Sequence, residues 1–321
     1  MPPVPSSECW FLTGPTASGK TAVGVELARR LGAEIVSLDS MTLYRGMDIG
    51  TAKPTPEQRR SVPHHLIDIL DPHQQYSVAQ YIDAADHCIQ QIRGRGREVL
   101  FVGGTPLYLK GLLRGIFHGP AADWELRRQL QEEAQRHGAE SLHRRLAEVD
   151  PAAAARLHPN DERRLIRALE VYHQSGRRIS DLQQQFQTGR PAEASRVFVL
   201  DWPKTELCAR IDRRVDAMFT AGLVDEVRRL LSLPQPLSRT ARQAVGYREV
   251  IAHLAGKCNL AETIELVKCH TRQLAKRQRT WFRSLEDCRF VPVSEPVDAA
   301  ELARAIQQAG QGVPHPPPVE G

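Results

Sequence analysis

The fold of this chain is decided by Gly14-Pro15-Thr16-Ala17-Ser18-Gly19-Lys20-Thr21. This stretch fits the phosphate-binding loop pattern, in which two glycines with four residues between them are followed by lysine and a hydroxyl residue. The apolar residues 10–12 precede it, and the helical pattern of residues 22–28 follows it. Because strand, loop and helix stand in the order that the motif requires, the sequence predicts a phosphate or pyrophosphate site. The residues expected to bind the anion are Gly14, Thr16, Ala17, Ser18, Gly19, Lys20 and Thr21, and the Thr21 hydroxyl is expected to hold Mg²⁺.

Composition indicates a globular protein with an anionic partner. The chain has 321 residues, of which 41% are hydrophobic and 25% charged, and these are ordinary proportions for a globular protein. No apolar run approaches the roughly 20 residues that span a bilayer, and the first residues lack a secretory signal. We therefore expect a cytoplasmic protein without membrane contact. The six cysteines have no zinc-site spacing and are interpreted as reduced thiols. The net charge of +5 favours an anionic partner without identifying one.

The distribution of apolar runs predicts an α/β fold, a three-layer phosphate-loop core with a parallel sheet. Residues 10–12, 35–38, 99–102 and 196–201 are expected to form buried strands, with helices between them and helices over 205–231 and 261–285. Residues 121–190 contain several helix-start signals and no strand, which indicates an inserted all-helical subdomain. The expected divisions are a catalytic core of residues 8–120 and 196–290, the insertion 121–190, and a disordered tail 310–321.

Two strand ends carry candidate catalytic residues. Asp39 follows the strand 35–38, and Thr105 follows two glycines after the strand 99–102. Ligands of open α/β sheets bind at these ends. Asp39 is therefore a candidate general base or Mg²⁺ ligand, and the Thr105 hydroxyl is a candidate hydrogen-bond donor to the bound phosphate. The alternatives are a helix cap and a simple turn. His64 and His65 lack a third ligand at a suitable spacing, and we interpret them as a structural turn.

Two groups of basic residues have helical spacing. Arg210 and Arg214 lie four residues apart and suit a diphosphate, although pairing with Asp212 or Asp216 on a solvated face is equally compatible. Residues 268–283 contain six Lys or Arg residues and no acid, and like charges at this spacing repel. We expect an anion to offset this repulsion. Together with the arginines of residues 163–167, this face predicts RNA binding.

The chain resembles the tRNA dimethylallyltransferases, also called tRNA isopentenyltransferases, of bacterial type. The longest matching run is Asp39-Ser40-Met41-Thr42-Leu43-Tyr44-Arg45-Gly46-Met47-Asp48-Ile49-Gly50-Thr51-Ala52-Lys53-Pro54. The other matches, in order, are residues 14–21, Gly103-Gly104-Thr105, His158-Pro159-Asn160-Asp161, Val245-Gly246-Tyr247-Arg248 and Arg272-Gln273-Leu274-Ala275-Lys276-Arg277-Gln278. The resemblance covers residues 9 to 285.

The resemblance implies transfer of a dimethylallyl group from dimethylallyl diphosphate to N6 of the adenosine 3′ of the tRNA anticodon. We expect the protein to be a monomer. It implies that Asp39 accepts the N6 proton, that Thr105 and Arg214 donate to the diphosphate, and that Lys20 and Thr21 bind it with Mg²⁺; Arg210 is expected to grip the same diphosphate. The residues expected to contact the anticodon stem-loop are Asp39, Ser40, Met41, Thr42, Thr105, Arg127, Arg163, Arg164, Leu165, Ile166, Arg167, Gln243, Tyr247, Arg248, Arg272, Lys276 and Arg279.

One departure and three alternatives accompany this interpretation. Many family members have Gln at the position of Thr42, so the base contact there is expected to differ. A small-molecule kinase would share the phosphate loop but would not need the basic helix. A non-catalytic RNA-binding module would leave Asp39 and the loop without a role, and a free-nucleotide prenyltransferase would not need the arginines of the insertion.

Overall fold

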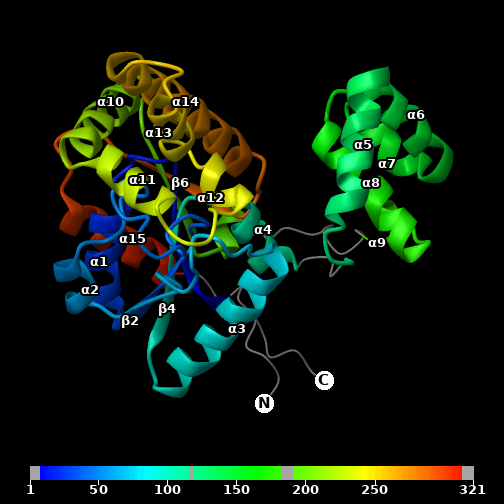
Figure 1. The fold of residues 1–321 in the computed structure, drawn as a ribbon. Coiled ribbons are helices and arrows are strands. Elements are labelled where there is room, and N and C mark those ends of the chain that lie inside the picture. Colours follow the sequence, from blue (N-terminus) through cyan, green and yellow to red (C-terminus); the bar gives the residue numbers. More distant parts are fainter. Residues whose placement is uncertain (1–7, 116–118, 183–190, 313–321) are drawn as a thin grey trace. The chain divides into compact units, whose positions relative to one another are not determined.

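The computed structural model describes residues 8–115, 119–182 and 191–312 (Figure 1). The chain divides into two compact units, one made of residues 1–113 and 189–321 and the other of residues 114–188. Most of the expected exit linker, residues 188–191, and the last part of the expected tail, residues 313–321, lie outside the described residues.

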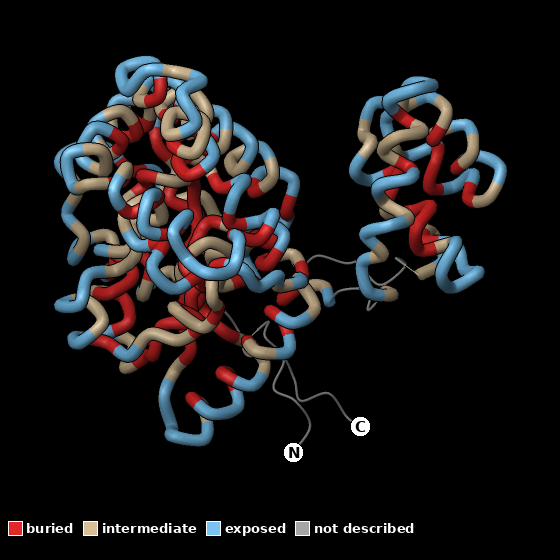
Figure 2. Tube along the Cα trace, in the orientation of Figure 1, coloured by how far each residue is buried: buried red, intermediate tan, exposed pale blue. Residues whose placement is uncertain are grey.

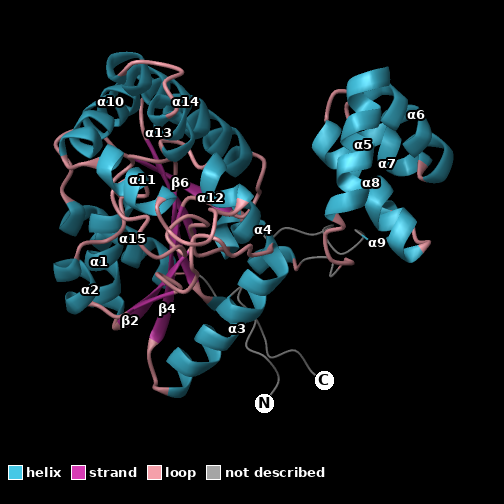
Figure 3. Ribbon diagram, viewed as in Figure 1, coloured by secondary structure: helices cyan, strands magenta, loops and turns pink. Residues whose placement is uncertain are grey.

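The larger unit is built on a six-stranded sheet in the order β3-β2-β4-β1-β5-β6, and every neighbouring pair is parallel. The sheet with its surrounding helices confirms the predicted α/β class (Figure 3). The strands are β1 (Trp10–Thr13), β2 (Ala33–Ser37), β3 (His64–His65), β4 (Glu98–Gly103), β5 (Val197–Asp201) and β6 (Cys288–Pro292).

The strands β1 and β2 are buried along their whole length, and β4 and β5 over most of theirs, because helices cover them. Figure 2 shows buried residues concentrated along these strands. Trp10 and Leu12 of β1 pack in one core with residues of α1 (Lys20–Leu31), α10 (Lys204–Thr220) and α15 (Ala299–Gln311). The intervening Phe11 stacks on Phe101 of β4, with ring centroids 4.9 Å apart. This alternation explains why β1 is a continuous apolar run in the sequence.

The carboxyl ends of β2 and β4 are joined by their backbones. Leu38 N–H donates to Val102 O at 2.9 Å, and Thr105 N–H donates to Leu38 O at 3.1 Å. A Cβ atom on Gly103 would stand 2.1 Å from the Leu38 carbonyl oxygen, so only glycine permits this approach. The join places Asp39 and Thr105 at the same edge of the sheet.

The remaining helices of the larger unit surround the sheet and its loops. They are α2 (Pro56–Ser61), α3 (Val78–Gly94), α4 (Pro106–Arg114), α11 (Leu223–Leu231), α12 (Arg239–Gln243), α13 (Tyr247–Leu254) and α14 (Leu260–Arg283), with a 3₁₀ turn at Ala192–Ala194.

The smaller unit is helical and has its own apolar core. Its elements are α5 (Trp124–His137), α6 (Ala139–Val149), α7 (Pro151–Arg156), α8 (Glu162–Ser175) and α9 (Ile179–Leu182). Three of these helices are capped at their start: the side chains of Asp123, Asp150 and Asp161 accept hydrogen bonds from the backbone N–H groups three residues later.

Four sequence predictions about the backbone were wrong or incomplete. The single helix expected over 205–231 is two helices, because Gly222 has a left-handed φ of 96° that ends α10 and begins α11. The expected turn at His64 is the short strand β3. Gly310 belongs to α15 and is buried, with its carbonyl accepting from Arg196 Nε at 3.2 Å, so the expected tail does not begin there. The strand β6 and the helix α15 were not expected.

Candidate active site

The phosphate loop connects β1 to α1. Gly19 precedes α1 without a side-chain cap, so the first N–H groups of this helix have no partner in their own helix or from a capping side chain. The carbonyls of the loop are held from outside: Arg210 Nε donates to Ala17 O and Trp202 Nε1 donates to Ser18 O, each at 3.0 Å. The Lys20 ammonium donates to Pro15 O at 2.7 Å. The loop therefore presents a positively polarised site to an anion.

Lys20 and Arg214 raise the positive potential at this site. Burial lowers the pKa of Lys20 to about 7, helped by Arg214, while Asp39 acts in the opposite direction. Burial also lowers the pKa of Arg214, and Asp39 again opposes this. Two cations held close together despite their repulsion and burial are typical of a site that receives an anion. The structure thus brings together three residues that the sequence analysis assigned to catalysis or binding, Lys20, Asp39 and Arg214.

Asp39 and Thr105 are fixed by short hydrogen bonds. One carboxylate oxygen of Asp39 accepts from Met41 N–H at 2.8 Å, and the Thr105 hydroxyl accepts from Ser40 N–H at 3.1 Å. The Thr42 hydroxyl is buried, bonded to the Ser37 hydroxyl at 2.7 Å and donating to Asp39 O at 3.2 Å. The position that departs from the family pattern therefore supports the Asp39 turn from within, which corrects its expected contact with the base.

Arg210 lies against the phosphate loop and is bonded within the protein there. It holds Ala17 O, pairs with Glu295 at 2.9 Å, and lies over the Trp202 ring at 4.3 Å. It therefore supports the loop, and its expected grip on the diphosphate stays a prediction. The two arginines are neighbours in helical spacing, but only Arg214 is turned toward Lys20 and Asp39 far enough to influence the pKa of Lys20.

The basic face of α14 is largely paired inside the protein. Arg272 pairs with Asp212 of α10 at 2.5 Å, and Arg279 pairs with Asp201 of β5 at 2.9 Å. Lys268 pairs with Asp216 at 2.8 Å. The expected anionic charge is supplied, for these three residues, by acids of the protein that lie far away in the sequence. RNA contacts of Arg272 and Arg279 stay predictions, and Lys276 is exposed.

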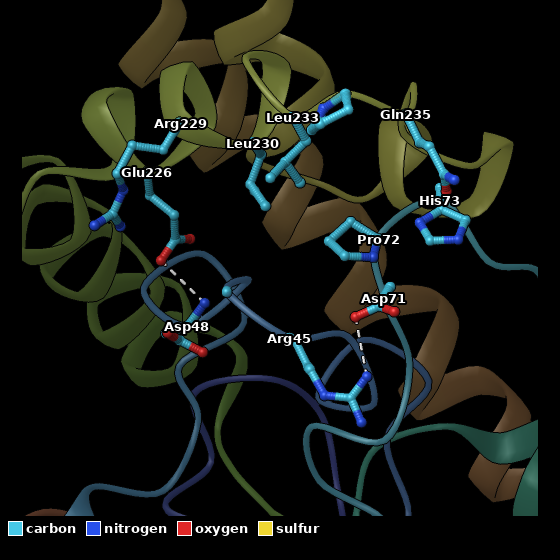
Figure 4. A pocket seen from close by; sticks show the side chains of 12 residues that line it. Arg45, Asp48, Asp71, Pro72, His73, Glu226, Arg229, Leu230, Leu233 and Gln235 are labelled. Atoms are coloured by element: carbon cyan, nitrogen blue, oxygen red, sulfur yellow. Dashed lines mark hydrogen bonds and ion pairs between the residues drawn. The ribbon is translucent and has the colours of Figure 1, made fainter.

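A second loop, residues 46–53, is held by a buried carboxylate. Glu226 of α11, 1% exposed, accepts from the N–H groups of Asp48 at 3.0 Å and Ile49 at 2.8 Å (Figure 4). The Tyr247 hydroxyl donates to the same carboxylate at 2.6 Å. Tyr247 is completely buried, so its expected contact with tRNA is corrected to a structural role, whereas Gln243 and Arg248 are exposed.

A pocket of about 560 Å³ lies beside this loop (Figure 4). Arg45 and Asp71 form an ion pair at 2.9 Å in its wall. Leu230 and Leu233 supply apolar surface on the side of α11.

In the helical unit, the expected tRNA residues fall into two groups. Leu165 and Ile166 are buried in the core of the unit, which corrects their expected contact. Arg127 and Arg167 pair with the buried Glu170 at 2.8 and 2.5 Å. The arginines at 163 and 164 are exposed. An amphipathic helix explains this division, because residues 163 and 164 face solvent while residues 165 and 166 face the core.

The residues present offer few protein ligands for a metal ion. Thr21 lies in the first turn of α1, which follows β1, and Asp39 follows β2, which β4 separates from β1 in the sheet. Among the residues that the structure describes, no three Asp, Glu, His or Cys side chains form a cluster suited to a metal. A magnesium ion here would need phosphate oxygens and waters as its other ligands, as is usual for this ion.

Comparison with known proteins identifies the family. The sequence model of the IPP transferase family matches residues 42–285 of this chain. The chain belongs to the IPP transferase family. This confirms the family predicted from the sequence motifs.

Curated relatives resemble the chain over most of its length. It is 47% identical over 304 residues to the tRNA dimethylallyltransferase of Rhodopirellula baltica, covering 92% of this chain and 91% of that protein. It is 50% identical over 273 residues to the enzyme of the same name from Geobacter metallireducens, covering 85% and 88%.

Solved structures agree with this assignment. The tRNA isopentenylpyrophosphate transferase of Bacillus halodurans is 38% identical, with a TM-score of 0.68 over 95% of this chain and 97% of that one. A eukaryotic dimethylallyltransferase acting on tRNA is 26% identical, with a TM-score of 0.71 over 94% of this chain and 76% of that one. Within the described ranges, this IPP transferase has no helix long and apolar enough to cross a bilayer.

Three supporting residues of this IPP transferase were missed from the sequence. Trp202 and Gln278 bond to the phosphate loop, and Glu226 bonds to the loop 46–53. Trp202 directly follows β5 and Gln278 lies in a matched motif, so a signal was available for both. Glu226 had none, since an acid on an amphipathic helix normally faces solvent.

Proposed function

We propose that the chain transfers the dimethylallyl group of dimethylallyl diphosphate to N6 of the adenosine 3′ of the anticodon in tRNA. The observation that carries this proposal is the meeting of Asp39 with two cations beside an uncapped helix N-terminus. A carboxylate beside an anion site supplies both halves of the reaction, proton removal and leaving-group stabilisation. The names of the relatives support this choice of substrates.

In the proposed reaction, the bond between the donor's first carbon and the diphosphate oxygen breaks, and its electron pair leaves with the diphosphate. N6 of the adenosine forms the new bond to that carbon, and its proton passes to the Asp39 carboxylate. Lys20, Arg214 and the N–H groups of the loop face the growing negative charge of the diphosphate. Each well-placed donor of this kind contributes about 3 kcal/mol to transition-state stabilisation.

Mg²⁺ belongs to this proposal, with Thr21 as its protein ligand. When bound, it neutralises part of the diphosphate charge. The Thr105 hydroxyl accepts from Ser40 N–H and keeps its own hydrogen for a diphosphate oxygen. The adenine leaves its stack to reach Asp39, at a cost of a few kcal/mol, which contacts along the anticodon stem-loop would offset.

We also propose that the protein is a monomer in the cytoplasm. All six cysteines are free, which supports a reducing compartment. Light scattering of the purified protein at micromolar concentration checks the monomer.

The test of the function is transfer of radiolabel from dimethylallyl diphosphate to unmodified tRNA, run beside an ATP-turnover assay. We expect label in tRNA that requires Mg²⁺, with no ATP turnover. ATP turnover without label would replace the prenyltransferase by a kinase. Binding of tRNA with neither reaction would leave only the non-catalytic RNA-binding module.

A further inference from the structure

A single side-chain amide connects the two halves of the proposed active site. Gln278 of α14 accepts from Thr16 N–H of the phosphate loop at 2.9 Å through its Oε1 atom. Its Nε2 atom donates to Gly104 O, in the turn after β4, at 2.7 Å. The amide oxygen thus accepts a hydrogen bond from one loop, and the amide nitrogen donates one to the other.

The two loops have different tasks in the proposed reaction. The loop at Thr16 would hold the diphosphate of the donor. The turn at Gly104 leads into Thr105, whose hydroxyl accepts from Ser40 N–H beside the base Asp39. Gln278 therefore links the loop that would hold the leaving group to the turn beside the group that would receive the proton.

The packing around the amide leaves little freedom for it to move. A Cβ atom on Gly104 would stand 2.8 Å from Nε2 of Gln278 and 3.2 Å from Gly14 O. The Lys20 ammonium would lie 3.7 Å from the same Cβ atom. The turn, the phosphate loop and the amide are thus in close contact, and a shift of one displaces the others.

We propose that Gln278 is a positioning residue that sets the distance between the donor held by the phosphate loop and the acceptor held beside Asp39. This inference rests on the proposed function. It differs from the tRNA contact that the matched motif implies for this helix, because the amide is directed at two protein loops. Gln278 acts through these loops and not by touching the reacting atoms.

The test uses Gln278→Met, which keeps the length of the side chain and removes both hydrogen bonds. The control is Gln307→Met on α15, where the amide likewise donates to one backbone carbonyl, Arg30 O, at 3.2 Å. That bond lies at the opposite end of α1 from the phosphate loop. We measure kcat and both KM values for transfer, the Kd of inorganic pyrophosphate, and the Kd of tRNA.

A positioning role predicts a loss of kcat without a matching loss of binding. We expect kcat of Gln278→Met to fall roughly 10- to 100-fold, because small misplacements of reacting groups have effects of this size. Both Kd values should change less than about threefold, the effect expected for one hydrogen bond at the weak end of its range. Gln307→Met should match the wild type. An unchanged kcat, or a Kd that rises by the same factor as kcat falls, would overturn the proposal.

A second readout does not need activity. Hydrogen exchange of the Thr16 N–H, followed by NMR, should be faster in Gln278→Met than in the wild type and unchanged in Gln307→Met. If the wild type transfers no label, the proposed function fails. The hydrogen exchange of Thr16 N–H then tests by itself whether Gln278 holds the phosphate loop. Equal exchange in both proteins would show that Gln278 does not hold the loop.

Discussion

The lowered pKa of Lys20 makes diphosphate binding pH-dependent. In the free protein this amine loses its proton near pH 7, whereas an ordinary lysine does so near 10.5. A bound diphosphate favours the charged amine and raises its pKa, so binding takes up a proton above pH 7. The affinity should then fall by up to tenfold per pH unit, or about 100-fold between pH 7 and 9.

The assay is calorimetric titration with inorganic pyrophosphate, without Mg²⁺, for the wild type and Lys20→Met at pH 6, 7, 8 and 9. The ratio of the two affinities cancels the titration of the ligand and of every other group. Lys204→Met, which removes an exposed lysine at the start of α10, is the control and should keep the wild-type profile. A ratio that stays constant from pH 6 to 9 would refute the reasoning.

The same shift has a consequence for stability that gives an independent check. The folded state disfavours the charged form of Lys20 relative to the unfolded chain. The resulting loss of folding stability is fully present below pH 7 and fades as the pH rises toward 10.5. Lys20→Met should therefore raise Tm over the wild type most at pH 6 and least at pH 9. A difference in Tm that stays the same from pH 6 to 9 would mean that burial does not lower the pKa of this lysine.

Three further predictions concern other parts of the molecule. Asp39→Ala should lower the transfer rate by orders of magnitude while tRNA binding stays nearly intact in a filter assay; equal loss of both would reject Asp39 as the base. Lys276→Ala should reduce the slope of log affinity for tRNA against log salt by about 0.7–0.9, and an unchanged slope would exclude Lys276 as a phosphate contact. Tyr247→Phe removes a bond to the Glu226 carboxylate and should cost about 1.5–3 kcal/mol in urea unfolding, so an unchanged midpoint would contradict the bond.

Local patterns made much of the fold predictable from the sequence. Four of the strands are buried runs, and the caps at Asp123, Asp150 and Asp161 have side chains that satisfy helix N–H groups within three residues. The phosphate loop is equally local, because its glycines, Lys20 and Thr21 are consecutive. Interactions within a few residues leave a signal in any single sequence.

What the sequence did not predict depends on distant partners. Arg279 is matched by Asp201, and no periodicity within α14 indicates an acid at the end of β5. Tyr247 carries a polar group and belongs to a matched motif, yet it is buried because Glu226 accepts its hydroxyl. The division of the helix at Gly222 had a visible signal, the glycine itself, which the apolar periodicity on both sides outweighed.

The support of the phosphate loop bears on how the protein is made. The motif itself is complete once residue 21 has been synthesised, but the side chains that bond to its backbone lie at Trp202, Arg210 and Gln278. While the chain leaves the ribosome, the phosphate-loop sequence is therefore present before the three side chains that hold its backbone in shape. The site becomes competent late in translation, after α14 has emerged, so a nascent chain arrested before that point would not sequester diphosphates in the cell.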